Sequence, residues 1–458
     1  MKKQIHSTNP ATGKRLASYT LLTKKELNDT LLSSSAAFLT WKKTTFSERS
    51  IILMRVAELL KKNKDRYAQM ITAEMGKTIR ESIAEVEKSA TVCTYYADNA
   101  ERFLKEEFIT TDATRSSVRF EPLGIIFAIM PWNFPFWQVF RAAAPSLMAG
   151  NAVVLKHASN VPGCSLLIEE IFTSAKLPKG VFQSLLIDSS QSEQVITYQD
   201  VHAITLTGSE GAGMSVAKSA GSALKKSVLE LGGSDPFIVL ADADVDAAAA
   251  TAVTARLIAT GQSCIAAKRF IVHKKIADRF TSRFIELLEA KRVGDPTDPT
   301  TDVGALANEQ ILKTIEGQVK ASLRAGAVLL TGGKRIGTVG YFYPPTVLGN
   351  VTEKMPVMNE ETFGPVAALT VVENDEEALR VANNTRYGLG SSLWTKDKKK
   401  MEKFIDGLHV GSVFINGMVK SDPRLPFGGT KMSGYGRELS SYGIREFVNV
   451  KTVWISHI

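Results

Sequence analysis

Short apolar runs alternate with helical segments through the middle of the chain, and this alternation constrains the fold more than any other feature. The apolar runs have the length and composition of buried strands: NAVVLKHAS, VFQSLLI, HAITLTGS and SVLELGG. The segments SLLIEEIFTSA and GMSVAKSAGSALKK have the periodicity of helices. Because a strand, a helix and a second strand form a right-handed crossover, we predict a doubly wound parallel sheet. The alternation resumes after residue 265, which predicts a second α/β domain.

The length and composition of the chain define its general class. The 458 residues exceed what one hydrophobic core usually supports, so we expect two or three domains. With 44% hydrophobic and 22% charged residues, the chain resembles an ordinary soluble protein rather than a disordered or fibrous one. Residues 24–107 carry apolar side chains at intervals of three and four, which predicts a long helical segment before the strand-like LGIIFAIM.

The basic residues are spread along the chain. Lys and Arg number 56 against 47 Asp and Glu, and the resulting net charge of +9 could suit an anionic partner. The densest basic run, KDKKK at 396–400, is typical of a solvent-exposed helix start, and no clustering indicates a nucleic-acid surface. We therefore expect no nucleic-acid partner.

The cysteines and the N-terminal residues indicate a compartment. The three cysteines have no CxxC spacing, which predicts neither a disulfide framework nor a metal site. MKKQIHSTNPATGK has no apolar segment behind its lysines, and no uninterrupted apolar stretch of roughly 18 residues occurs elsewhere. We expect a cytoplasmic protein without a membrane partner.

Cys264, in GQSCIAAKRF, differs in its setting from Cys93 and Cys164. The latter two occur within apolar helical patterns, where a thiol usually packs as a small hydrophobic side chain. Cys264 instead follows the helical AAAATAVTARLIAT and precedes the strand-like RFIV, which places it in a loop. A nucleophile and an unreactive side chain both remain open, because a thiol is activated by neighbours that spacing does not display.

Glu230, in VLELGGSDP, ends an apolar strand and is followed by Gly232 and Gly233, where the backbone can turn sharply. We expect a half-buried carboxylate, whose pKa burial would raise toward the range of a general base at neutral pH. A helix-capping or ion-paired glutamate is the alternative interpretation.

The segment TLTGSEGAG places Gly208, Ser209 and Gly213 between a strand and a helix that we expect to start near Met214. Glycines at such a turn let backbone amides approach a phosphate at the helix N-terminus. The spacing is not GxGxxG, and no Lys-Ser or Lys-Thr follows, which excludes a Walker-type loop. A plain turn is an equally good interpretation.

Two further loops carry polar candidates. In IMPWNFPFWQVFR, two prolines restrain the chain around Trp132 and Asn133, and an immobilised amide donor can stabilise an oxyanion. In EETFGPV, at 360–366, two carboxylates precede another strand-like run. The second loop taken alone could be only a turn.

Five stretches occur in a fixed order and together resemble the aldehyde dehydrogenase superfamily: PWNFP, TGS, LELGG, GQSC and EETFGPV. The resemblance extends over essentially the whole chain, from STNPATGK to LPFGGTKMSGYGREL at 425–439. Within the superfamily the chain is most similar to bacterial succinate-semialdehyde dehydrogenases. The resemblance implies NAD(P)-dependent oxidation of succinate semialdehyde, or of a similar short carboxylated aldehyde, to the acid.

The resemblance also implies the catalytic roles. Cys264 matches the nucleophile that attacks the aldehyde and forms a thiohemiacetal. Asn133 and the backbone N–H of Cys264 match the oxyanion hole. After hydride transfer leaves a thioester, Glu230 matches the base that activates the hydrolytic water. This order divides one difficult oxidation into two steps.

The same resemblance implies the cofactor contacts and no metal. Ser159 stands where strongly NAD-selective relatives carry a glutamate that would repel a 2′-phosphate, so we expect NADP to be accepted and preferred. Lys156 matches a residue beside the adenosine ribose, and Ser209 matches a pyrophosphate contact. The expected cofactor-binding residues are Trp132, Lys156, Ser159, Gly208, Ser209, Gly213, Glu361 and Phe363.

The resemblance implies a site for the distal carboxylate of the substrate. Arg141, eight residues after Asn133, matches an arginine of succinate-semialdehyde dehydrogenases, and a guanidinium binds a carboxylate bidentately. A surface or ion-paired arginine is the alternative. Ser421 matches a second contact, with Arg424 as a competing candidate. Ala266 replaces the second cysteine that some relatives carry, so we expect no disulfide switch.

The resemblance divides the chain into two doubly wound α/β domains and a small β arm. We expect a Rossmann-type cofactor domain over 1–108 and 126–231 and a catalytic domain over 232–440. An oligomerisation arm over 109–125 and 441–458 implies a homodimer or homotetramer. Other functions weighed are a broad-specificity aldehyde dehydrogenase, a phosphorylating or CoA-acylating relative, a cysteine hydrolase, and a non-catalytic binding protein of the same fold.

Overall fold

The computed structural model describes residues 3–456. The segment predicted to be helical forms four helices: α1 (Lys24–Trp41), α2 (Phe46–Lys62), α3 (Lys64–Met75) and α4 (Ile79–Phe103). Capping boxes define the first turns of α1 and α2, where Thr23 pairs with Glu26 and Thr45 with Glu48. The prediction of a helical segment before the first sheet is confirmed. The chain begins, however, with an antiparallel hairpin that the sequence did not indicate, β1 (Gln4–Thr8) and β2 (Arg15–Thr20).

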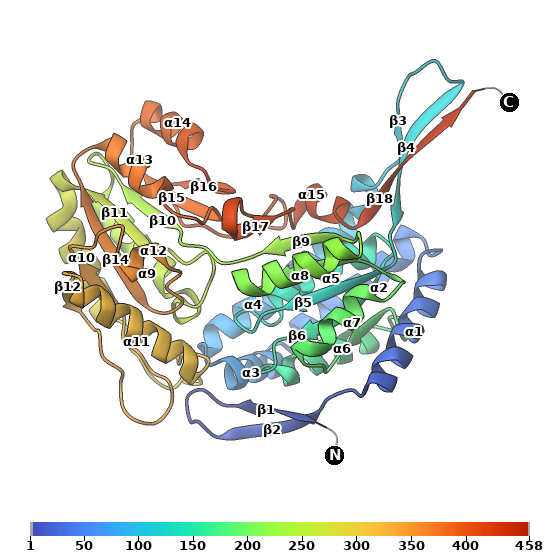
Figure 1. Cartoon of the computed structure of the whole chain (residues 1–458), viewed down its shortest axis with the longest axis horizontal. Helices are drawn as coiled ribbons and strands as arrows, with labels where there is room; N and C mark the ends of the chain where they lie inside the picture. Colours follow the sequence, from blue (N-terminus) through green and yellow to red (C-terminus); the bar gives the residue numbers. More distant parts are fainter. Residues whose placement is uncertain (1–2, 457–458) are drawn as a thin grey trace.

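A six-stranded sheet forms the lobe drawn on the right in Figure 1. Its strands are parallel except for one short edge strand. In spatial order they are β17 (Gly434–Tyr435), β9 (Lys226–Glu230), β8 (Val201–Thr207), β5 (Ile125–Met130), β6 (Ala152–His157) and β7 (Phe182–Ser184). The helices between them are α5 (Trp137–Met148), α6 (Pro162–Ser174), α7 (Ser192–Thr197) and α8 (Glu210–Ser222), with a 3-10 turn at Ser189–Gln191. The predicted doubly wound fold is confirmed.

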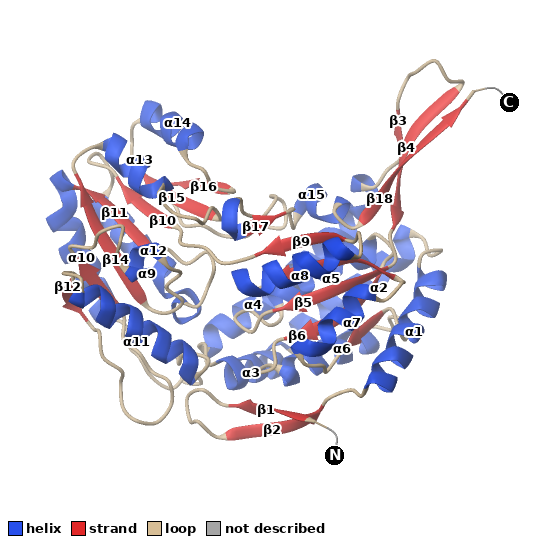
Figure 2. Ribbon diagram, viewed as in Figure 1, coloured by secondary structure: helices blue, strands red, loops and turns tan. Residues whose placement is uncertain are grey.

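A seven-stranded sheet forms the other lobe, and only its edge strand β12 is antiparallel. In spatial order the strands are β12 (Val328–Thr331), β13 (Thr346–Gly349), β14 (Val366–Val372), β11 (Arg269–His273), β10 (Pro236–Val239), β15 (Gly390–Trp394) and β16 (Ser412–Ile415). The helices are α9 (Val245–Leu257), α10 (Ala277–Glu289), α11 (Glu309–Arg324), α12 (Pro356–Asn359), α13 (Asp375–Asn383) and α14 (Lys398–Gly407), with 3-10 turns at Ile258–Gly261, Lys274–Ile276 and Lys431–Ser433. Figure 2 shows helices on both sides of the strands in each lobe.

Burial on both faces explains why the strands read as continuous apolar runs. In β10, Ile238 packs into one hydrophobic cluster and its neighbours Phe237 and Val239 into another. In β5, Ile126 and Phe127 likewise enter different clusters. Successive side chains of a strand point to opposite faces, so a strand covered by helices on both sides is mostly apolar.

A three-stranded antiparallel arm projects from the right-hand lobe (Figure 1). It consists of β3 (Glu107–Phe108), β4 (Arg115–Pro122) and β18 (Val448–Ile455), which follows α15 (Ser440–Arg445). The strand β17 also returns to this lobe, because Gly434 pairs with Glu230. The expected catalytic range of 232–440 therefore includes an edge strand of the six-stranded sheet.

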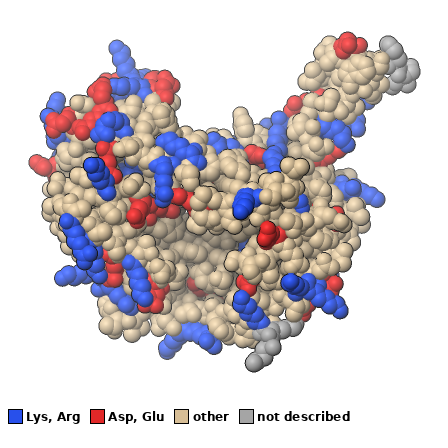
Figure 3. Space-filling model, viewed as in Figure 1, with Lys and Arg blue, Asp and Glu red and all other residues tan. Residues whose placement is uncertain are grey.

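Charged side chains of both signs are interspersed over the face shown in Figure 3. The KDKKK run forms the first turn of α14, where the Asp397 side chain accepts hydrogen bonds from the backbone N–H groups of Lys399 and Lys400. Among residues 3–456, no helix is both long enough and apolar enough to cross a membrane.

Candidate active site

Cys264 lies where two cavities meet. The first cavity, of about 190 Å³, is lined by residues of α4 and α5, by Ser421 and by Cys264. The second, of about 320 Å³, is lined by residues that follow β5, β8 and β9, by the loop that carries Glu361, and again by Cys264. The carboxyl ends of parallel strands are the usual binding edge of an open α/β sheet. Two molecules, one bound in each cavity, would therefore meet at the Cys264 thiol.

The backbone before Cys264 adopts an uncommon conformation. Within the 3-10 turn after α9, Ala259 and Thr260 have φ of 52° and 58°. Such conformations cost about 1–3 kcal/mol each in residues other than glycine, so other contacts must hold them. The Ala259 N–H donates to Glu81 at 2.7 Å, and Arg256 donates to the Gly261 carbonyl at 2.8 Å.

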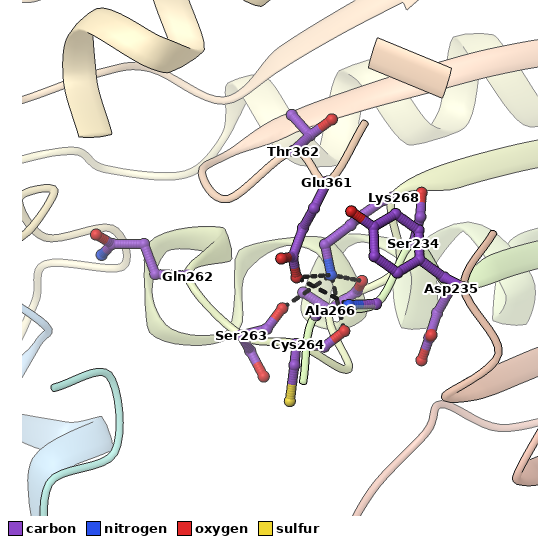
Figure 4. A network of polar contacts seen from close by, with 12 residues as sticks. Ser234, Asp235, Gln262, Ser263, Cys264, Ala266, Lys268, Glu361 and Thr362 are labelled. Atoms are coloured by element: carbon purple, nitrogen blue, oxygen red, sulfur yellow. Dashed lines mark hydrogen bonds and ion pairs between the residues drawn. The ribbon is translucent and has the colours of Figure 1, made fainter. Parts of the chain in front are cut away.

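Lys268 stabilises the nucleophile loop, residues 261–266 around Cys264, from the protein interior (Figure 4). Its buried Nζ donates to the carbonyl oxygens of Ser263, Cys264 and Ala266 at 3.0, 2.8 and 3.2 Å. The same ammonium lies 3.7 Å from the carboxylate of Glu361. In Figure 4 the sulfur of Cys264 points away from this network, so Lys268 contacts the backbone of the loop while the thiol remains on the cavity side.

The Cys264 thiol is only partly exposed, and its environment acts on its pKa in both directions. Burial raises the pKa to about 12, while the cations Lys268 and Arg141 act to lower it. Cys93 and Cys164 are fully buried, and burial raises the pKa of each thiol as well. Of the three cysteines, only Cys264 therefore combines access to a cavity with neighbouring positive charge.

Asn133 lies against the second cavity at the end of β5. Its Nδ2 donates one hydrogen bond, at 2.9 Å, to the carbonyl of Gln262 in the nucleophile loop, and an amide carries a second N–H. The turn is held by Lys77, whose Nζ donates to the Asn133 carbonyl at 3.0 Å and forms a buried ion pair with Glu85. Glu85 also accepts from the Phe136 N–H at 2.8 Å. A buried charge pair thus immobilises the turn.

Glu230 is buried, with 2% of its surface exposed, and is not half-buried as expected. Among residues 3–456, neither carboxyl oxygen of Glu230 has a hydrogen-bond partner. Burial, and next the nearby carboxylate of Glu438, raise its pKa well above the ordinary value, while Arg141 and Arg437 oppose the shift. The expectation of partial burial was wrong because β17 lies at the edge of the sheet and pairs with Glu230 itself.

Arg141 lines the first cavity from α5, and its Nε forms a buried ion pair with Glu438. Its Nη2 donates to the hydroxyl of Thr207 at 3.2 Å, and the guanidinium lies over the Phe427 ring at 4.8 Å. The structure therefore shows the ion-paired arginine that was the alternative interpretation, and this side chain also lines the cavity. Its contact with a substrate carboxylate stays a prediction.

Ser421 lines the same cavity, whereas its competitor Arg424 does not. Arg424 is exposed and pairs with Asp422 at 2.6 Å. The hydroxyl of Ser421 accepts a hydrogen bond of 2.7 Å from Nζ of Lys88, a cavity residue that sequence reasoning missed. The signal in the sequence was the spacing of Glu81, Glu85 and Lys88, which places these three charged residues on one face of the predicted helix.

The second cavity contains most of the predicted cofactor contacts. Trp132, Gly208, Ser209, Glu361 and Phe363 line it, and the rings of Trp132 and Phe363 meet edge to face at 5.7 Å. Glu361 accepts from the Gly233 N–H at 3.0 Å. A Cβ at Gly232 would lie 2.5 Å from the Glu361 carboxylate, so only glycine permits this approach.

The remaining predicted cofactor residues, Lys156, Ser159 and Gly213, lie outside the lining of this cavity. Lys156 is in β6 and Ser159 follows that strand, next to β5 at the same sheet edge. Gly213 lies inside α8, which starts at Glu210 and not near Met214 as expected, because Ser209 caps it through Ala212 N–H. A Cβ at Gly213 would come within 2.6 Å of Leu231, so this glycine allows the helix to pack.

The chemistry of the second cavity suits the nicotinamide half of a dinucleotide. It offers an aromatic wall, the N-terminus of α8 capped by Ser209, and the buried Asn133 Oδ1, which has no partner among residues 3–456. Within the same residues, no group of three or more His, Cys, Asp or Glu is placed to hold a metal ion.

Comparison with known proteins agrees with this geometry. A model of the aldehyde dehydrogenase family matches residues 1–453. The chain is 50% identical to a Mycobacterium tuberculosis succinate-semialdehyde dehydrogenase (NADP+), over 99% of this chain and 100% of the relative. It is 38% identical to a solved succinic semialdehyde dehydrogenase from Streptococcus pyogenes in complex with NADP+, with a TM-score of 0.97 over 99% of this chain and 100% of the other. A solved succinate-semialdehyde dehydrogenase from Burkholderia pseudomallei is 34% identical, again with a TM-score of 0.97, over 99% and 95% of the two chains.

The match of the family model covers nearly the whole chain, and the solved structures share its architecture. This similarity accounts together for the two α/β lobes, the cysteine between two cavities and the buried glutamate. The chain belongs to the aldehyde dehydrogenase family.

Proposed function

We propose that the protein oxidises succinate semialdehyde to succinate with NADP+ as the preferred oxidant. The proposal is supported by relatives that carry this activity in their names, at 50% identity over the full length. The observation that carries it is the position of Cys264 between a cavity that contains cationic side chains and a cavity suited to a nicotinamide.

The residues around Cys264 have the chemistry for each step of the reaction. The thiolate attacks the aldehyde carbon, and the second N–H of Asn133 and the backbone N–H of Cys264 donate to the oxygen that becomes negative. A nicotinamide held in the second cavity, beside Trp132 and Phe363, would supply the hydride acceptor, and Cys264 would then carry the thioester. Glu230 then takes a proton from the water that attacks the thioester, and burial raises the pKa of its carboxyl, which increases the basicity of the carboxylate.

The preference for NADP+ rests on Lys156 and Ser159. Lys156 is half-buried near the end of β6, and burial lowers its pKa. Among the described residues, no carboxylate lies within ion-pair distance of its ammonium. Ser159 is an exposed hydroxyl nearby in sequence. An ammonium and a hydroxyl suit a 2′-phosphate, whereas a carboxylate would repel it.

The absorbance of the reduced nicotinamide, followed with succinate semialdehyde and NADP+ or NAD+, tests the proposal. We expect faster turnover with NADP+, and loss of turnover in Cys264→Ala but not in the matched control Cys93→Ala, which removes a buried thiol of α4. Turnover in Cys264→Ala would exclude the mechanism. Equal rates with succinate semialdehyde and with a broad set of uncharged aldehydes would contradict the proposed substrate and indicate a broad-specificity aldehyde dehydrogenase.

We further propose that the arm assembles the protein as a homodimer or homotetramer. Its strands expose large apolar side chains, among them Phe108, Val450 and Trp454. An exposed antiparallel edge with apolar residues is suited to pairing with a second copy. Light scattering after size exclusion measures the assembly directly, and Trp454→Lys should shift it toward the monomer. A monomeric wild-type protein would contradict the proposal.

We also propose a cytoplasmic location. All three cysteines are free thiols, as expected for a protein that works in a reducing compartment. Cell fractionation with an antibody against the protein tests this, and recovery outside the cytosolic fraction would contradict it.

A further inference from the structure

Two cationic side chains line the cavity beside Cys264, and they differ in their pairing. The guanidinium of Arg141 is already in a buried ion pair with Glu438. Lys88 has no such partner, since no carboxylate of residues 3–456 lies within 4.0 Å of its Nζ. Its contacts are the Ser421 hydroxyl at 2.7 Å and the face of the Trp137 ring at 4.2 Å.

This difference decides which residue can neutralise an incoming anion. The charge of Arg141 is compensated by Glu438, so a carboxylate beside it would meet a neutral pair that offers N–H donors but little net charge. A carboxylate that leaves water needs an uncompensated cation, because an unpaired buried charge is costly. Lys88 is the cavity residue that supplies one.

We propose that Lys88, together with the Ser421 hydroxyl that it holds, is the principal determinant of specificity for a carboxylated aldehyde. The inference rests on the proposed function, since it takes the substrate to carry a distal carboxylate. Lys88 comes from α4 and Ser421 from the loop before α15, so the recognition site spans two parts of the chain that are 333 residues apart. Arg141 lines the same cavity.

The surroundings of Lys88 make its charge sensitive to pH. Burial and Arg141 of α5 lower its pKa to about 8, aided by Lys420, while Glu85 of α4 and Asp422 act in the opposite direction. Below this pKa the ammonium is charged and available to a carboxylate. As the pH rises through about 8, the charge is lost and the selectivity should decline with it.

The test compares succinate semialdehyde with butanal, which has the same chain length and no carboxylate. In Lys88→Met we expect the ratio of their kcat/KM values to fall by about tenfold to a hundredfold, through KM for succinate semialdehyde, with butanal nearly unchanged. Lys88→Arg should restore much of the ratio. The matched control is Lys64→Met, which removes an exposed lysine that pairs with Glu87 on the outer side of α4.

The pH profile separates a charge effect from a packing effect. The wild-type ratio should decline above about pH 8, whereas the ratio of Lys88→Arg should stay level because arginine remains charged. An equal loss for both aldehydes, or an unchanged ratio in Lys88→Met, would overturn the inference. A wild-type enzyme that does not prefer succinate semialdehyde would overturn the proposed function instead. Thermal unfolding of each variant establishes that the compared proteins are folded.

Discussion

Arg141 of α5 and Glu438, just before α15, form an ion pair in which each side chain is 2% exposed. Arg141 lines the first cavity, and Glu438 also raises the pKa of Glu230. One member of this buried ion pair therefore lines the first cavity, and the other changes the pKa of the expected base.

Replacing Glu438 by Gln should destabilise the protein. Arg141 would keep a hydrogen-bond acceptor but lose its counter-charge, so we expect the free energy of unfolding to fall by about 3 kcal/mol. Urea denaturation measures this change. The control is Glu446→Gln, because Glu446 pairs with the exposed Lys226 and should contribute less than about 1 kcal/mol. Equal losses in the two variants would contradict the role of burial.

Replacing Glu230 by Gln should separate the two halves of the reaction. Acylation does not need this base, so a burst of reduced cofactor should remain, while steady-state turnover falls by about a hundredfold or more. Rapid-mixing absorbance resolves the two phases. Unchanged steady-state turnover would show that another group activates the water.

The same substitution should have a pH-dependent effect on stability. The folded-state pKa of Glu230 is raised, so the wild-type protein binds this proton more tightly when folded and loses stability as the pH rises above the unfolded value. Glu230→Gln does not ionise, and its melting temperature relative to wild type should therefore increase from acid to neutral pH. Scanning calorimetry across this range checks the sign. A difference that is constant with pH would mean that the carboxyl is not shifted.

Replacing Ser159 by Glu should change the preference between the two cofactors. A carboxylate at this position would repel the 2′-phosphate, and we expect kcat/KM for NADP+ to fall by about tenfold or more. The value for NAD+ should hold or rise. Ser159→Gln is the matched control, since it adds similar volume without charge. An equal fall in kcat/KM for NADP+ and NAD+ would indicate a steric effect only.

Replacing Lys268 by Met should act on the Cys264 thiol as well as on stability. The buried ammonium is the first of the groups that lower the thiol pKa, so its removal should raise that pKa further and slow alkylation by iodoacetamide at a given pH. Arg269→Met is the control, because Arg269 is equally buried but donates to carbonyls away from the loop, such as that of Ser234. Similar alkylation profiles in the two variants would argue for a purely structural lysine.

Local pattern was sufficient for the elements that define the fold. The nearly continuous apolar runs identified buried parallel strands, because strands covered on both faces are mostly apolar. The two glycines after Glu230, and Gly208 after the HAITLT run, marked where strands end. Local pattern misplaced the start of α8, since a single capping hydroxyl decides that boundary and the periodicity does not.

Local pattern was insufficient for charge and burial at the site. The sequence indicated a glutamate at a strand end, but the edge strand β17, some 200 residues further on, buries it. It indicated an arginine for a carboxylate, and the fold pairs that arginine with Glu438. Lys88 was missed because its helical spacing marks a charged face but does not reveal that Ser421, 333 residues away, is its partner.

The sequence by itself determined the order of strands and helices, the residues at their ends, and the resemblance that named Cys264, Asn133 and Glu230. These features depend on side-chain periodicity and on residue types at short spacing. Only the tertiary structure decided which charges are compensated: Arg141 by Glu438, with Lys88 left available in the same cavity. Electrostatic free energy depends on distance and solvent exposure, and both are set by segments hundreds of residues apart.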